Sequence, residues 1–259
     1  MKRLLLLLAI CLPVFVFGQG FGSFLSDPPY LAKDITAGSF DWQTPFIDYR
    51  IDRGLGAVTL TNGAPLTSWT NQGTWTHTTI SATPYWTSDF VTSTNKSFTT
   101  SQLSEVLPQP LVLMSVMRSI RNGGGSGGFL LGDTGGSGVS MGPPNVGAGI
   151  VDVFLGAHMA TTSAMYVNGV SNFFLLTIII NGASSSIRSN GVQIKTGNVG
   201  GGSIGDGSGG FGIGHATYNA FSFGNYDFQR FLLWTNTLTT QFLTNAENQL
   251  ISDFHIIGL

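Results

Sequence analysis

The last third of the chain places its segments in an order that leaves few folds open. An apolar run at 173–180 is followed by a turn signal at Asn190-Gly191, a glycine-rich stretch, a second apolar run at 231–234 and an amphipathic segment. Asn190 and Gly191 supply the two positive-φ residues that a type I′ turn needs, and apolar or β-branched residues alternate on either side. This order predicts short antiparallel strands that end in one helix.

The helix is predicted over residues 240–253. Thr239 or Thr240 can cap its first turn through a side-chain hydroxyl. Its apolar residues share one face at helical spacing: Phe242, Leu243, Ala246, Leu250 and Phe254. A single apolar stripe predicts that the helix lies on the sheet and is not enclosed by the core.

Earlier segments extend the pattern. Residues 64–73 read Ala-Pro-Leu-Thr-Ser-Trp-Thr-Asn-Gln-Gly, residues 111–118 form an apolar run, and glycines lead into Phe-Leu-Leu-Gly at 129–132. In this order the segments resemble laminin-G-like (concanavalin A-like) domains over roughly residues 40–256, while 142–170 match no segment of that family. The resemblance implies an all-β fold, a two-sheet antiparallel jelly-roll sandwich with one short C-terminal helix. It also implies that Trp69 belongs to the core.

The first 18 residues have the pattern of a secretory signal peptide. Two basic residues precede an almost wholly apolar stretch at 4–17, which is too short to span a bilayer as a helix. Gly18 suits the last position before a signal-peptidase cut. We therefore expect a signal peptide at 1–18, an N-terminal extension at 19–39 and the sandwich domain at 40–259.

These boundaries predict a chain that is secreted, or held at the cell surface or in the periplasm. The only cysteine, Cys11, lies in the apolar stretch and follows Ile10, whereas a lipoprotein signal needs a small residue there. The mature domain then has no disulfide and no membrane span, so its core alone must stabilise it.

Charge argues against a nucleic-acid partner. Eleven basic residues, two of them in the leader, stand against 13 acidic ones, and the basic residues are scattered along the chain. No stripe of lysine and arginine is available to neutralise phosphates. Charged residues make up 9% of the chain, far below the usual quarter, so serine, threonine, asparagine and glycine solvate the surface.

The acidic and nucleophilic residues do not form a catalytic pattern. Glycosidases of this superfamily use paired carboxylates, but the two glutamates, Glu105 and Glu247, have no aspartate two residues away. The four histidines show no zinc spacing, and the glycine-rich run at 200–214 lacks the lysine and helix of a phosphate loop. We predict that the chain is not an enzyme and that this run is a mobile loop feeding a strand.

Calcium is the one cofactor that the sequence leaves open. Hard oxygen ligands suit this ion, and aspartates beside loops could supply them. The candidates are Asp133 and Asp206, with Asp152 as a third. No Asp-x-Asp cluster concentrates charge, so any such site would be weak.

Aromatic residues are the candidates for ligand contact, because flat rings stack on the C–H faces of sugars. Trp75, Tyr85 and Trp86 lie among threonines and serines, where a large ring is hard to bury, and Tyr218 flanks the glycine-rich run. Trp234 lies within an apolar run and is predicted to be core.

These observations favour an exported, non-catalytic carbohydrate-binding or adhesion module. Its expected partner is a glycan or an extracellular surface polymer. The alternative is a structural subunit of an extracellular or virion surface assembly, which would use its neutral faces for protein contacts or self-assembly. Exposed rings gathered in one place would favour a glycan, and a broad apolar patch would favour assembly.

Overall fold

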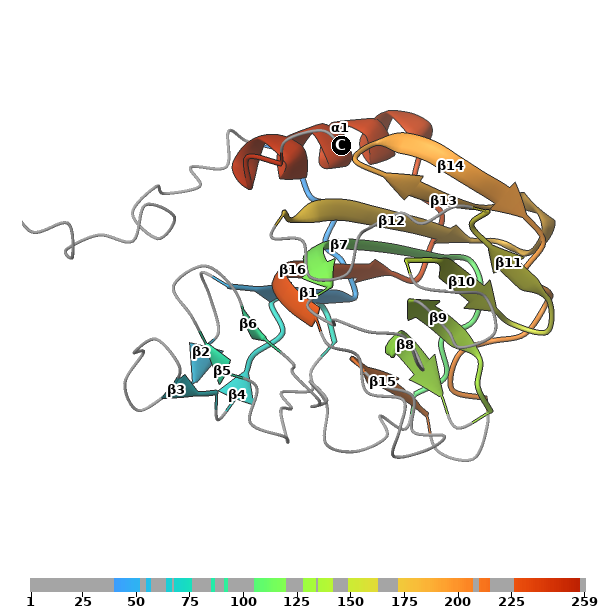
Figure 1. Cartoon of the computed structure of the whole chain (residues 1–259), viewed down its shortest axis with the longest axis horizontal. Coiled ribbons are helices and arrows are strands. Elements are labelled where there is room, and N and C mark those ends of the chain that lie inside the picture. The colour runs from blue at the N-terminus through green and yellow to red at the C-terminus, as the bar shows by residue number, and fades with distance from the viewer. Residues whose placement is uncertain are drawn as a thin grey trace, which may run out of the picture.

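Two antiparallel sheets of nine and five strands pack face to face, and one helix, α1 (Thr240–Asp253), lies across the outer face of the larger sheet (Figure 1). The computed structural model describes residues 40–51, 55–56, 64–66, 68–75, 85–86, 91–92, 105–119, 128–133, 135–141, 149–162, 172–206, 210–214 and 226–256. The predicted signal peptide and N-terminal extension lie outside the described residues.

The nine-stranded sheet joins segments from the whole domain. Its order is β14 (Val192–Gly197), β13 (Ser185–Ser189), β12 (Phe174–Ile180), β7 (Leu111–Ser119), β16 (Tyr226–Trp234), β6 (Val91–Thr92), β5 (Tyr85–Trp86) and β3 (Ala64–Pro65). β1 (Ile47–Arg50) also pairs with β16, and a short 3-10 helix, η1 (Gly182–Ser184), precedes β13. The central strands β12, β7 and β16 are therefore far apart in the sequence.

The five-stranded sheet runs in the order β11 (His158–Ala160), β10 (Val151–Phe154), β9 (Gly138–Met141), β8 (Phe129–Asp133) and β15 (Phe211–Ile213). β2 (Leu55–Gly56) and β4 (Ser68–Trp69) form a separate two-stranded ladder. Strands β8 to β11 follow one another along the chain and pair in the same order, so most of this sheet joins segments that are neighbours in the sequence.

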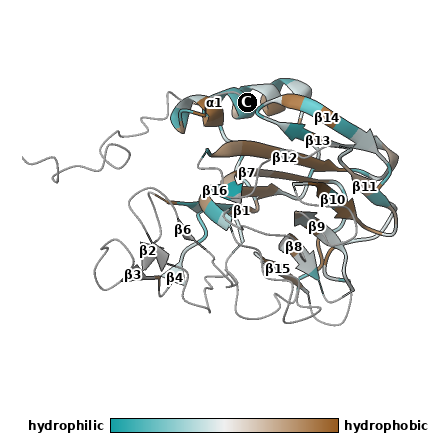
Figure 2. Ribbon diagram, viewed as in Figure 1, coloured by the Kyte–Doolittle hydropathy of each residue, from teal (hydrophilic) through white to brown (hydrophobic). Residues whose placement is uncertain are grey.

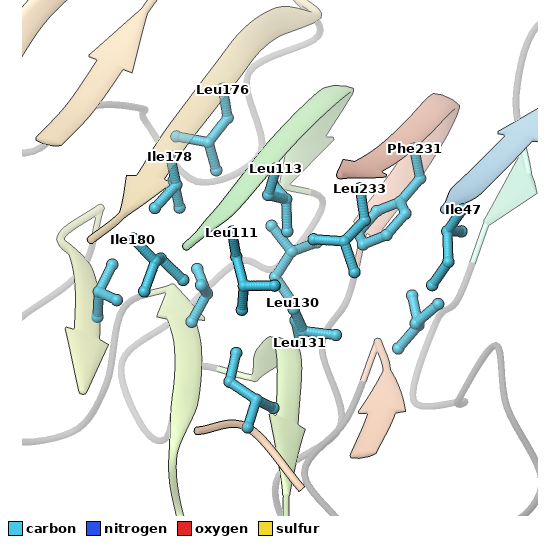
Figure 3. Packing of buried hydrophobic residues seen from close by; sticks show 14 of the residues in the cluster. Ile47, Leu111, Leu113, Leu130, Leu131, Leu176, Ile178, Ile180, Phe231 and Leu233 are labelled. Carbon is cyan, nitrogen blue, oxygen red and sulfur yellow. The ribbon is translucent and has the colours of Figure 1, made fainter. Parts of the chain in front are cut away.

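The central strands of the larger sheet are buried on both faces. Leu111 and Leu113 point toward the smaller sheet (Figure 3), while Val112 and Met114, which alternate with them along β7, pack on the α1 side. This explains why β7 and β12 read as continuous apolar runs, coloured brown in Figure 2, although antiparallel strands with one solvated face alternate.

The structure confirms the predicted fold class and most of its landmarks. α1 begins at Thr240, capped by Thr239, whose hydroxyl accepts a hydrogen bond from Phe242 N at 3.2 Å. Asn190 and Gly191 have φ of 49° and 79° and close the β13–β14 hairpin. Trp69 and Trp234 are buried as expected.

One predicted strand boundary was wrong. β16 begins at Tyr226, five residues before the predicted apolar run, because Asp227 and Arg230 are buried through ion pairs. On α1, Glu247 is buried together with the apolar stripe. None of the helices in the described part of the chain has both the length and the apolar character needed to cross a bilayer.

Candidate functional site

Trp75 does not present an exposed ring. Its side chain is 5% exposed. The indole lies 5.9 Å from the ring of Phe46 and 5.8 Å from the ring of Phe211, measured between centroids. Phe46 precedes β1 and Phe211 belongs to β15, so Trp75 packs between elements that are distant in sequence. The expectation that this ring is free to stack on a ligand is therefore contradicted by its burial.

The other aromatic candidates are placed only in part. Tyr85 and Trp86 form β5, between β3 and β6 in the larger sheet. Their side chains, and the whole of Tyr218, lie outside the described residues. Their assignment as ligand contacts stays a prediction.

The structure brings the two calcium candidates close together but gives Asp133 a different role. Asp133 is fully buried, and its Oδ1 accepts a hydrogen bond from Ser137 N at 2.9 Å. Its Oδ2 accepts one from Gly205 N at 2.8 Å, one residue before the exposed Asp206. Asp133 thus fixes the backbone of two loops. Within the part of the chain that the structure describes, no three histidine, cysteine or acidic residues gather to hold a metal ion.

The start of the glycine-rich run is held in place and is not a mobile loop. Gln109 Nε2 donates to the carbonyl oxygens of Gly200 and Gly202 at 3.1 and 2.7 Å, and Ile204 pairs with Leu107. Gly205 has φ of 93°, and a Cβ there would lie 2.6 Å from the carbonyl oxygen of Glu105. The close approach requires glycine at this position. The run does lead into a strand, β15, as predicted.

A cluster that sequence reasoning did not assemble lies on the outer face of the five-stranded sheet. Val151 and Val153 of β10 point into the core. The alternation of side chains along a strand therefore turns Asp152 and Phe154 to the other face. The β10–β11 register places Phe154 opposite His158. We call Asp152, Phe154 and His158 the β10–β11 cluster.

Within the cluster, a hydrogen bond and a ring contact hold the histidine. Asp152 Oδ2 accepts a hydrogen bond from His158 Nδ1 at 2.8 Å. The imidazole and the Phe154 ring have centroids 4.4 Å apart and planes inclined by 30°. The His158 side chain is 68% exposed, whereas that of Asp152 is 7% exposed. Of the two neutral tautomers of His158, the carboxylate selects the one with the proton on Nδ1, and in that tautomer Nε2 is a hydrogen-bond acceptor.

The second carboxylate oxygen of Asp152 is buried and unsatisfied. Among the described residues, Oδ1 has no hydrogen-bond partner. The neighbour across the β9–β10 ladder is Ser140, which is also buried. A buried acceptor without a partner costs on the order of 1–3 kcal/mol, and more when it is charged.

Two of the other buried carboxylates, Asp48 and Glu247, are paired on both oxygens. Arg230 donates from Nε and Nη2 to Asp48 at 3.0 and 2.9 Å and lies over the ring of Trp42. Arg188 donates to both oxygens of Glu247 at 2.8 Å and ties the β13–β14 hairpin to α1. The hydrogen bonds to Glu247 raise the pKa of Arg188. These pairs hold the outer face of the larger sheet together.

Comparison with known proteins gives a fold and no family. No protein-family model and no curated protein matches the sequence. Among solved structures, the ligand-binding domain of botulinum neurotoxin serotype D in complex with N-acetylneuraminic acid has a TM-score of 0.51 at 8% identity. The match covers 81% of this chain and 52% of that one. The likeness shows a shared fold.

Two further solved structures have lower scores. The binding domain of paraclostridial mosquitocidal protein 1 has a TM-score of 0.46 at 10% identity over 81% of this chain and 53% of its own. A Trypanosoma rangeli sialidase in complex with sialic acid has a TM-score of 0.46 at 12% identity, over 79% and 33%. The chain thus spans between a third and about half of the chains it matches.

Proposed function

We propose that this chain is an exported, non-catalytic carbohydrate-binding or adhesion module of the laminin-G-like, concanavalin A-like class. The observation that carries the proposal is the fold shared with the toxin ligand-binding domain, whose structure holds N-acetylneuraminic acid. A shared fold does not fix a function. The surface chemistry supports the same conclusion, because an exposed imidazole packs on an aromatic ring at the surface of the smaller sheet.

The proposed lack of catalysis is supported by the positions of the acids. Glycosidases place two carboxylates across one scissile bond, about 5–9.5 Å apart. Here Asp48, Asp227 and Glu247 each bond to an arginine, and Asp133 bonds to backbone N–H groups. Each of these four carboxylates is therefore held by hydrogen-bond donors of the fold itself. Purified mature chain is expected to release no reducing sugar from common polysaccharides above a buffer control.

Glycan-array binding of the mature chain, residues 19–259, tests the proposal. Arrays are run with calcium and with a chelator, so that a metal requirement is measured separately from sugar binding. Selective binding to one group of glycans is expected. Failure to bind any glycan, under both conditions and with a folded protein, would overturn the proposed function.

Export is proposed from the signal peptide alone and is tested on the secreted product. Expression of the full chain with residues 1–18 is expected to yield extracellular or periplasmic protein whose first residue is Gln19. A full-length product that stays in the cytoplasm would contradict this part of the proposal.

One observation favours the alternative role in an assembly. Val192 and Ile194 of β14 are 64% and 41% exposed, and β14 is the last strand at one edge of the nine-stranded sheet. An edge strand with apolar side chains offers backbone groups to another chain. Sedimentation analysis of the mature chain separates the roles, because a structural subunit is expected to form defined oligomers that Ile194→Lys disrupts.

A further inference from the structure

The β10–β11 cluster has no role in joining the two sheets. Val151 and Val153 supply the contacts of β10 with the core. Phe154 is half-buried and His158 is largely exposed, so both rings stand on the surface beside each other. Flat apolar and heteroaromatic faces of this kind are what the C–H surface of a pyranose stacks on.

Asp152 distinguishes the cluster from an ordinary contact between two surface rings. Asp48, Asp227 and Glu247, which are comparably buried, each pair with an arginine, whereas Asp152 pairs with an exposed histidine. Asp152 bonds through Oδ2 alone, while Oδ1 is buried without a partner among the described residues. A carboxylate in this setting lowers stability. Residues that lower the stability of the fold in this manner are commonly found at binding sites.

From this geometry we infer that the β10–β11 cluster is the sugar-contacting site of the chain and that it takes a neutral pyranose. The inference rests on the proposed function. Phe154 and His158 contact the sugar: because the two rings pack face to face, the outer face of the pair stacks on its C–H face, and His158 Nε2 accepts a hydrogen bond from a hydroxyl. Asp152 is a positioning residue that holds the imidazole through Nδ1.

The charge of the cluster sets its preference. Asp152 brings a negative charge directly behind the imidazole, and a ligand carboxylate placed there would meet like charge. Three arginines, Arg118, Arg188 and Arg230, are committed to carboxylates of the nine-stranded sheet and α1. The site therefore favours a neutral hexose over an acidic sugar such as N-acetylneuraminic acid, the ligand of the similar toxin domain.

Binding of soluble sugars by variants of the mature chain tests the site. The probes are the methyl glycosides of glucose, galactose, mannose and N-acetylglucosamine, with N-acetylneuraminic acid as the acidic probe. His158→Ala and Phe154→Ala are each expected to weaken binding of the preferred neutral glycoside about tenfold. Thr244→Ala, an exposed change on α1, is the control and is expected to bind like the wild type.

Asp152→Asn separates a positioning role from a structural one. Because the change removes a buried charge and keeps the shape, the melting temperature is expected to equal or exceed that of the wild type. Affinity for the neutral glycoside falls, and discrimination against N-acetylneuraminic acid narrows. A lower melting temperature with unchanged affinity would show that Asp152 is purely structural and would overturn its assignment.

The remaining outcomes separate the site from the function. Wild-type binding that survives both His158→Ala and Phe154→Ala would overturn the site and leave the proposed function standing. Wild-type preference for N-acetylneuraminic acid would overturn the charge argument. Absence of binding to every glycan would overturn site and function together. Because His158 is exposed, its variant tests the site even where Phe154→Ala fails to fold.

Discussion

Replacing Trp75 tests whether its ring belongs to the core, because the sequence and the structure predict opposite effects on stability. The sequence places this ring among threonines and serines and predicts a surface anchor whose loss spares stability. The structure places it between Phe46 and Phe211, at 5.9 and 5.8 Å, with 5% of the residue exposed. The indole therefore joins the segment before β1, through Phe46, to strand β15 of the smaller sheet, through Phe211.

The magnitude follows from the size of the ring. Truncating a buried tryptophan to alanine costs about 3–5 kcal/mol, because the apolar transfer energy is lost and a cavity remains. For a chain of this length each kcal/mol shifts the melting temperature by about 2–4 °C. Trp75→Ala is therefore expected to melt about 6–20 °C below the wild type. Trp75→Phe keeps an aromatic ring in the same place and is expected to lose less than half of that.

Urea unfolding followed by circular dichroism, with a thermal scan, measures both variants against the wild type. The midpoint should fall in the order wild type, Trp75→Phe, Trp75→Ala, with an unchanged slope. If Trp75→Ala instead melts within about 2 °C of the wild type and loses glycan binding, the ring is a surface anchor and our account of the core is refuted.

Three further changes test other parts of the structure. Asp48→Asn leaves the buried Arg230 without its bidentate partner and is expected to cost about 3–5 kcal/mol in urea unfolding; a loss under 1 kcal/mol would contradict this. Asn71→Ala removes the Oδ1 that accepts from Asp48 N and Gly73 N and the Nδ2 that donates to two carbonyl oxygens, and a loss of about 2–4 kcal/mol in stability is expected. Tyr49→Phe removes a buried hydroxyl that has no partner among the described residues and is expected to stabilise by about 1 kcal/mol. Burial raises the pKa of Tyr49 above its ordinary 10.0. The Tyr49 hydroxyl therefore ionises at lower pH in the unfolded chain than in the folded one, and the free energy of unfolding falls as the pH rises above 10.0. Measured from pH 8 to 11, the stability of Tyr49→Phe should fall less steeply than that of the wild type.

Elements whose local sequence agrees with their environment were predicted well. The turn residues Asn190 and Gly191 tolerate positive φ, and Thr239 provides the cap of α1. Both effects act within a few residues and need no knowledge of the rest of the chain. The central strands were predicted correctly because α1 covers one of their faces and the smaller sheet the other, so their sequences are continuous apolar runs.

Charged residues that pair within the fold were misread. Asp227, Arg230 and Glu247 look like solvated positions in the sequence, yet each is buried against a partner far along the chain. Arg230 meets Asp48 across 182 residues. Hydropathy patterns treat each charge as solvated, so the predicted apolar run begins at residue 231 and leaves out the first half of β16.

The β10–β11 cluster was missed for a related reason, since its chemistry exists only after the strands have found their register. From the sequence, Asp152 was considered only as a calcium ligand and His158 only as one of four histidines without zinc spacing. Phe154 and His158 meet because β10 and β11 pair residue 154 with residue 158. A slip of one residue would turn the cluster into the core and the valines out to solvent. Burial of Val151 and Val153 therefore excludes that slip and keeps the carboxylate, imidazole and phenyl ring on the outer face, so the apolar half of the strand positions its polar half.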